Sequence, residues 1–325
     1  MREPRLVPDA EPTSYYGRPV IKAPVWKWPV AAYIFAGGMA GASSVLAAGA
    51  RATGNAPLAR RARWTAVGAI SAGVLLLVED LGRPDRFRNM LRVAKPTSPM
   101  SVGSWILSVY GPAAALAAVA DAVGLPPVVG RLADTVAGAA GPAVATYTAV
   151  LVSNTAIPVW HEARRELPFV FAGGAAAAAG GAAMVTTAPT QAGPARGFGL
   201  LGVGAELGAS ALARRRLGWI GDVYRTGRAG AMDRLATWLS GVGVVVTWSC
   251  GRRRLGGVVG GAMLVGGSLA KRFAVMQAGV QSANDPASTI GPQRRRLERD
   301  DGGDVAGLAP GSPSARLPIS GRRPR

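Results

Sequence analysis

Long apolar segments alternate along the chain with short segments rich in arginine. Four apolar runs contain no charged residue, and each is long enough to cross a bilayer core of about 30 Å. They cover residues 28–50, 96–120, 135–160 and 167–195. Four further apolar segments are shorter or interrupted by charge, at residues 64–81, 197–213, 235–251 and 255–280. The pattern predicts an all-α, polytopic membrane protein with about eight transmembrane helices.

Composition supports this prediction. The 325 residues are 49% hydrophobic, with a mean hydropathy of +0.22, yet the formal net charge is +19. A soluble helical bundle needs polar helix faces, whereas the long runs here are apolar all round, as helices in contact with lipid are. The 45 glycines suit close helix packing in a membrane, although a compositional bias towards small residues would account for them equally well.

Three regions are expected. Residues 1–27 are polar and rich in proline, residues 28–280 form the membrane domain, and residues 281–325 are rich in Pro, Gly, Ser and charge. The last region cannot bury a core, so we expect it to be disordered and assign it no nucleic acid partner. The first apolar run is too long for the core of a signal peptide, so we expect it to remain in the mature protein.

The content of metal-binding residues is low. The chain has one cysteine, Cys250, and one histidine, His161. These numbers exclude an intramolecular disulfide, a four-cysteine cluster and a haem held by two histidines. We therefore expect no haem, no iron–sulfur cluster and no other metal site in this chain.

Basic residues are distributed unequally between the two sides of the membrane. With eight spans, the segments that share a side with the N-terminus carry 18 Lys and Arg residues, and the loops of the other side carry nine. Cytoplasmic loops are the more basic ones. We therefore expect both termini in the cytoplasm of a bacterial cell, with the chain in the inner membrane.

A few ionisable residues lie within the predicted spans, where each costs about 2.5–3.5 kcal/mol on insertion scales. They are Glu79, Asp80, Glu206, Lys271 and Arg272. In a structural interpretation Asp80 caps a turn, while Lys271 and Arg272 extend to the lipid headgroups. Glu206 is too deep for that, so either proton handling or a hydrogen bond between helices would explain it.

Uncharged polar residues indicate a pocket at one membrane face. Tyr147 and Asn154 are seven residues apart, on one face of a helix, and His161 follows that span. Tyr33 lies one to two turns into the first span from the same side. Glu79, Asp80, Lys271 and Arg272 approach this side too. Hydroxyl and amide donors with nearby bases suit a quinone, although the same residues would serve contacts between helices.

Several strings resemble one membrane protein family in content and order. They are WPVAAYIFAGGMAG at 28–41, DLGRPDRF at 80–87, YTAVLVS at 147–153 followed by PVW at 158–160 and LPFVF at 167–171, and Arg272-Phe273 followed by Ala278-Gly279. The chain resembles, from residue 14 to residue 297, the NrfD/PsrC family, the membrane subunits of polysulfide-reductase-type and related molybdoenzyme complexes. An ordered set of matches is more specific than any single glycine-rich string.

The resemblance implies two four-helix bundles and a quinone, menaquinone or ubiquinone, bound as substrate near one membrane face. It also implies electron exchange with a ferredoxin-like iron–sulfur subunit of the four-cluster type, beyond which lies a molybdopterin oxidoreductase subunit. Tyr33, Asp80 and Tyr147 match the family's quinone region best, followed by Asn154, His161 and Arg272. Some relatives have a histidine in the first span, and this chain has none there.

The sequence thus predicts a quinone- or quinol-binding membrane anchor subunit of a respiratory oxidoreductase complex, not catalytic by itself. Asp80, Glu79, His161 and Glu206 are the candidates for proton exchange, and Tyr33, Tyr147, Asn154 and Arg272 are the candidates for quinone binding. The alternatives are a structural anchor without quinone chemistry and a transporter of small solutes or protons.

Overall fold

The structure is a computed structural model, and it describes residues 19–24, 26–82 and 89–291. Every regular element in this part of the chain is a helix. The elements are α1 (Trp28–Ala52), α2 (Ala56–Leu81), α4 (Pro99–Val123), α5 (Pro127–Ser153), α6 (Pro158–Glu162), α7 (Leu167–Thr186), α8 (Gly193–Leu217), the 3-10 helix η2 (Gly218–Tyr224), α9 (Gly227–Cys250) and α10 (Arg254–Asn284). The predicted all-α fold is confirmed.

Local sequence signals explain where these helices begin and end. The helices α1, α2, α4, α5, α7 and α8 each have a proline in the first turn, where no backbone donor is needed. The Asn55 side chain caps α2 by accepting a hydrogen bond from the Leu58 amide, 3.2 Å away. Gly82 and Gly124 end α2 and α4 with φ of +69° and +70°, a conformation that favours glycine.

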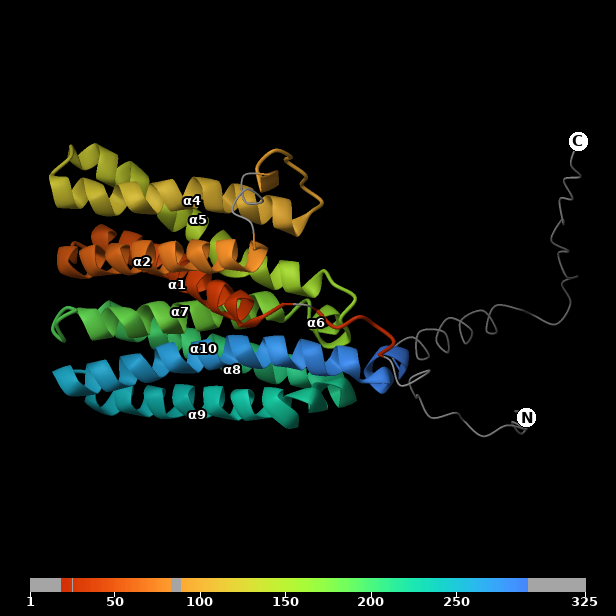
Figure 1. Cartoon of the computed structure of the whole chain (residues 1–325). Coiled ribbons are helices and arrows are strands. Elements are labelled where there is room, and N and C mark those ends of the chain that lie inside the picture. Colours follow the sequence, from red (N-terminus) through yellow and green to blue (C-terminus); the bar gives the residue numbers. More distant parts are fainter. Residues whose placement is uncertain (1–18, 25, 83–88, 292–325) are drawn as a thin grey trace, which may run out of the picture.

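The long helices form two groups of four. One group contains α1, α2, α4 and α5, and the other contains α7, α8, α9 and α10. Helix α7 packs against α1 and α5 and joins the two groups, so that the molecule is a row of antiparallel helices from α4 at one edge to α9 at the other (Figure 1). This arrangement agrees with the two four-helix bundles that the resemblance implies.

Six of the long helices have the length and hydropathy of membrane spans, namely α1, α2, α4, α5, α7 and α10. Helices α8 and α9 are less apolar because charged residues interrupt them, but they have similar lengths of 25 and 24 residues. Large apolar side chains on the outside of the molecule, such as Leu75, Phe169 and Trp248, are more than half exposed, as expected for lipid contact. The protein is therefore a multi-pass membrane protein.

Pairs of glycines bring neighbouring helices into backbone contact. A Cβ added to Gly41 of α1 or to Gly141 of α5 would overlap the carbonyl oxygen of the other glycine. In the second bundle, a Cβ added to Gly202 of α8 would lie 2.7 Å from the Gly173 carbonyl oxygen of α7. Such close approach is how membrane helices gain packing energy without a hydrophobic driving force. The glycine content thus has a structural role in this fold.

Several boundaries differ from the sequence prediction. Helix α2 begins at Ala56 rather than at residue 64, because it carries arginines that we expected in a loop. Helix α7 ends at Thr186 rather than at residue 195, and the connection that follows contains Pro189 before α8 begins at Gly193. Helix α10 continues to Asn284, and residues 286–291 are also helical. Disorder was therefore wrongly predicted for residues 281–291, and the rest of that region lies outside the described residues.

The glycine contacts predict a difference between two alanine variants of α8. Gly202→Ala places a methyl group against the α7 backbone and should destabilise the protein by about 1–3 kcal/mol. Gly204→Ala faces open space and should match or exceed the wild type, since alanine is the better helix former. Thermal unfolding in detergent measures both. Equal midpoints for the two variants would contradict the packing role of Gly202.

Candidate functional site

A cleft of about 580 Å³ lies where α4 begins and α5 ends. We refer to this end of the molecule, at which α6 lies, as the α6 end (Figure 1). Tyr147, Asn154 and His161 line the cleft, so the structure brings together three residues that the sequence predicted to converge. The remaining lining residues are Pro96, Thr97, Pro99, Val102, Val150, Ser153 and Arg164. The cleft therefore combines apolar walls with a few polar groups.

Tyr147 is positioned by the contact between α4 and α5. A Cβ added to Gly103 of α4 would overlap the ring of Tyr147. The missing side chain at Gly103 thus provides the space that the ring occupies. A glycine one turn from the beginning of α4 therefore fixes where the tyrosine hydroxyl lies.

His161 reaches the cleft because α5 is interrupted. The helix ends at Ser153, and the Asn154 amide donates to the Val150 carbonyl as the C-cap. Residues 155–157 then lead to the short helix α6. The neighbouring Trp160 is fully buried, and its indole N–H donates to the Val275 carbonyl of α10 at 2.8 Å. This bond holds α6 in place and so positions His161.

Trp160 is held further by two contacts. Its ring stacks on Trp26, with ring centroids 5.3 Å apart. It also fills the space left by Gly279 of α10, where an added Cβ would overlap the indole ring. The segment before α1, the α6 segment and α10 therefore meet at one aromatic side chain beside the cleft.

Tyr33, Asp80 and Glu79 lie at the same end of the molecule but do not line the cleft. Glu79 and Asp80 are exposed in the last turn of α2. Tyr33 of α1 is within electrostatic range of both Asp80 and Tyr147.

Glu206 and Arg272 lie elsewhere, inside the second bundle. Both are nearly inaccessible, at 1% and 2% exposed. Arg272 donates to the Phe171 carbonyl at 2.6 Å and lies 4.0 Å above the Phe171 ring. A Cβ added to Gly174 would overlap Glu206 Oε2 and lie 3.3 Å from Arg272 Nη1, so both side chains occupy the space above this glycine.

The predictions for Arg272 and Lys271 therefore need correction. Neither side chain extends to the headgroups and neither joins the cleft, because each finds a partner within the second bundle. Among the described residues, both carboxylate oxygens of Glu206 and two nitrogens of Arg272 lack a hydrogen bond. The hydrogen bond between helices that was one explanation for Glu206 is thus not observed in this part of the chain.

A buried ion pair was missed by the sequence analysis. Lys271 Nζ lies 2.6 Å from Asp233 Oδ1, and Arg214 Nη1 lies 3.2 Å from Asp233 Oδ2. Asp233 belongs to α9, which begins eight residues before the predicted span. The sequence places Asp233 just before an apolar segment, which could have indicated a buried carboxylate. Its partner Lys271 is 38 residues away, so the pairing could not be recognised from local sequence.

A small cavity of about 20 Å³ adjoins this pair, enough for one water molecule. Ser210, Tyr224, Asp233 and Lys271 are among the residues that line it. Tyr224 lies in η2, outside the spans. Burial raises the pKa of its phenol, and the Asp233 carboxylate raises this pKa further. Tyr224 therefore remains protonated at physiological pH and acts as a hydrogen-bond donor or acceptor without a charge.

Metal-binding groups do not cluster in the described ranges 19–24, 26–82 and 89–291, where no three His, Cys, Asp or Glu side chains lie close enough to share an ion. The expected lack of a haem or iron–sulfur cluster stays a prediction from the sequence.

Comparison with known proteins identifies one family. The family model described as polysulphide reductase, NrfD, matches residues 19–193, which is more than half of the chain. The matched region contains α1 to α7 and every residue that lines the cleft. Glu206, Asp233 and Arg272 lie beyond it. No curated protein matches the chain.

The buried pair predicts a strong effect of removing one partner. Asp233→Asn leaves the Lys271 ammonium buried without a counter-charge and should destabilise the protein by about 3–5 kcal/mol. The double variant Asp233→Asn with Lys271→Met removes both charges and should recover much of this loss. Thermal unfolding in detergent gives both values. A double variant less stable than Asp233→Asn alone would contradict the pairing.

Proposed function

Because the chain belongs to the polysulphide reductase NrfD family, we propose that it is the quinone-binding membrane subunit of a respiratory oxidoreductase complex. The observation that carries this proposal is the cleft at the α6 end, where Tyr147, Asn154 and His161 meet. The chain anchors the complex in the membrane and offers quinone or quinol a site at one membrane face. Chemistry on the final substrate takes place in another subunit.

The cleft offers the groups that a quinone ring requires. Its volume of about 580 Å³ is within the usual range for small-molecule sites, about 300–1,000 Å³. The hydroxyl of Tyr147 and the amide of Asn154 can donate to the two carbonyl oxygens of the oxidised ring. The imidazole of His161 can accept a proton when quinol is oxidised. Apolar side chains such as Val102 and Val150 contact the ring faces.

Quinol oxidation releases two protons, which must leave the site. Tyr33 is within electrostatic range of both Tyr147 and Asp80. Asp80 and Glu79 are exposed at the end of α2, so they can exchange protons with water. We assign the exit route to Tyr33, Asp80 and Glu79, with His161 as the first acceptor.

Electrons leave to a partner subunit in this proposal, because this chain, with one cysteine and one histidine, cannot supply four cysteines to a cluster or two histidines to a haem. The partner is a ferredoxin-like iron–sulfur subunit docked at the α6 end, next to the cleft, with a molybdopterin oxidoreductase subunit beyond it. Exposed basic side chains at this end attract an acidic partner surface. They include Arg164, Arg215, Arg225 and Arg228.

The orientation follows from charge. The α6 end carries the larger number of Lys and Arg residues, so it faces the cytoplasm of a bacterial cell. Both termini then lie on the cytoplasmic side of the inner membrane. The cleft and its docked partner are on that side as well.

Glu206 has a separate role in this proposal. An ionisable group deep in a membrane bundle is functional by default, and its carboxylate oxygens make no hydrogen bond in the described part of the chain. Ser210 lies one turn further along α8 and lines the small cavity beside Lys271. Glu206 takes up and releases a proton through this cavity. Loss of a carboxyl band from the infrared spectrum of Glu206→Gln would identify the group.

The first test is purification of the full chain from its native membrane in mild detergent. We expect an iron–sulfur protein and quinone to accompany it. Bound partner without quinone would indicate a structural anchor, and recovery alone would indicate a transporter.

The Tyr147 position gives a second test. Gly103→Ala displaces Tyr147 and should lower the quinone bound per protein about fivefold, the effect of one lost hydrogen bond. The control Gly111→Ala lies on the same helix and faces open space.

Asp80 provides a kinetic prediction. Asp80→Asn should lower quinone-linked turnover by about 100-fold if this carboxylate accepts a proton. The complex should stay intact because the side chain is exposed. The control Asp222→Asn removes an exposed carboxylate at the same end, in the second bundle, and should retain turnover. Unchanged turnover in Asp80→Asn would remove this residue from the proton route.

A further inference from the structure

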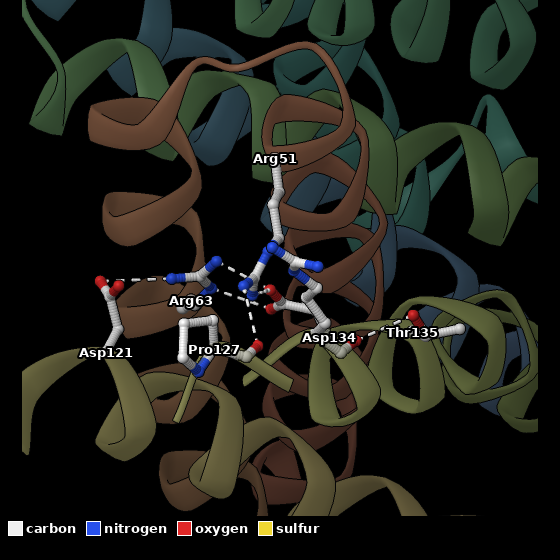
Figure 2. Close-up of polar contacts among 7 residues, drawn as sticks. Arg51, Arg63, Asp121, Pro127, Asp134 and Thr135 are labelled. Carbon is white, nitrogen blue, oxygen red and sulfur yellow. Dashed lines mark hydrogen bonds and ion pairs between the residues drawn. The ribbon is translucent and has the colours of Figure 1, made fainter. Parts of the chain in front are cut away.

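A network of four charged side chains lies at the end of the first bundle opposite to the α6 end (Figure 2). Asp134 of α5 is at its centre. Arg63 Nε donates to Asp134 Oδ1 at 2.8 Å, and Arg63 Nη2 donates to Asp134 Oδ2 at 2.7 Å. Arg51 of α1 also pairs with Asp134. The side chains of Arg63 and Asp134 are only 6% and 5% exposed, so the geometry of this pair is rigid.

The fourth member, Asp121 of α4, completes the network only loosely. Its carboxylate lies 3.2 Å from Arg63 Nη1 and is 42% exposed. This contact is an ion pair without the geometry of a hydrogen bond, unlike the two bonds from Arg63 to Asp134. The Arg63 guanidinium is therefore held less tightly on the side that faces Asp121 than on the side that faces Asp134.

A cavity of about 400 Å³ opens at this position. Arg51, Arg60, Arg63 and Asp121 line it, together with Ala56 and Pro57 in the first turn of α2. The three arginines outnumber the two carboxylates of the network, which leaves an excess of positive charge. The first turn of α2 adds the partial positive charge of a helix N-terminus. The cavity is thus suited to an anion.

Arg60 strengthens this interpretation. It is exposed and, in the described part of the chain, takes part in no ion pair or side-chain hydrogen bond. Two other arginines at this end are bonded within the protein: Arg196 donates to the Gly251 carbonyl, and Arg254 donates to the Thr187 carbonyl. Arg60 therefore lies on the rim of a preformed cavity, and no described carboxylate pairs with its guanidinium.

The surroundings favour a lipid as the source of the anion. The cavity lies at the ends of membrane spans, between α2 and the outermost helix pair of the row (Figure 1). Apolar side chains of α2, α4 and α5 at this end of the first bundle are exposed, with Trp64 at 48%, Val123 at 64% and Val128 at 58%. These surfaces can contact acyl chains, and an exposed tryptophan is typical of the headgroup level.

We propose that the cavity lined by Arg51, Arg60 and Arg63 binds the phosphate of an anionic phospholipid headgroup. Asp134 holds two of the arginines in a fixed position, and Arg60 closes over the phosphate from the rim. Asp121 opposes the anion by its charge. The lipid fixes the loop between α1 and α2 against α4, at the end of the bundle away from the quinone cleft, so the proposal is independent of quinone binding.

The test uses the full-length protein in a neutral detergent, with short-chain phosphatidylglycerol and phosphatidylcholine as probes and native mass spectrometry as the readout. Phosphatidylglycerol should bind and phosphatidylcholine should not. Arg60→Gln should weaken binding of phosphatidylglycerol about fivefold, as expected for one basic residue at a membrane surface. Arg61→Gln, the same change at an exposed neighbour outside the cavity, should have less than a twofold effect.

A gain-of-binding variant adds a second criterion. Asp121→Asn removes the opposing charge, should preserve the fold because the side chain is half exposed, and should tighten binding of phosphatidylglycerol. Equal losses in Arg60→Gln and Arg61→Gln would overturn the proposal, because they indicate attraction by diffuse surface charge. Binding of inorganic phosphate that depends on Arg60 and resists competition by phosphatidylglycerol would overturn the lipid assignment in favour of a free anion.

Discussion

Backbone contact between paired glycines is the constraint on which the rest of this structure depends. Gly41 with Gly141 and Gly173 with Gly202 let neighbouring helices approach until no side chain fits between them. This closeness leaves little room for lipid or water between the helices. Polar groups inside must then find partners in the protein, and the positions of charged side chains follow from that requirement.

The charged side chains inside the bundles differ in whether they contact a partner of opposite charge. Lys271 pairs with Asp233, and Arg63 pairs with Asp134, each across two helices. The paired residues are 38 and 71 positions apart in sequence, and the pairs leave little charge unbalanced in the apolar interior. Glu206 differs, since its carboxylate oxygens make no hydrogen bond in the described part of the chain. Ionisable groups of the same residue type therefore differ in their contacts, and the proposed functional role is assigned to the one whose oxygens lack a hydrogen bond.

The candidate site was predictable to the extent that it depends on helix geometry. Tyr147 and Asn154 were predicted to share a helix face, and His161 follows that span, so all three were expected at one pocket. All three line the cleft. Arg272 was wrongly grouped with them, because its depth along α10 does not reveal which bundle its side chain enters. Asp134 was missed since its partner Arg63 lies 71 residues away.

The sequence by itself determined the class of fold, the number of long helices and the family, because hydrophobic runs of bilayer length and ordered local motifs are properties of contiguous residues. Only the tertiary structure decided which charges pair, where α2 begins, and that the second bundle encloses Glu206 and Arg272. Those features depend on contacts between segments distant in sequence. The physical reason is that a charge in a membrane bundle is stabilised by whichever helix packs beside it, and packing is decided by small residues on both helices.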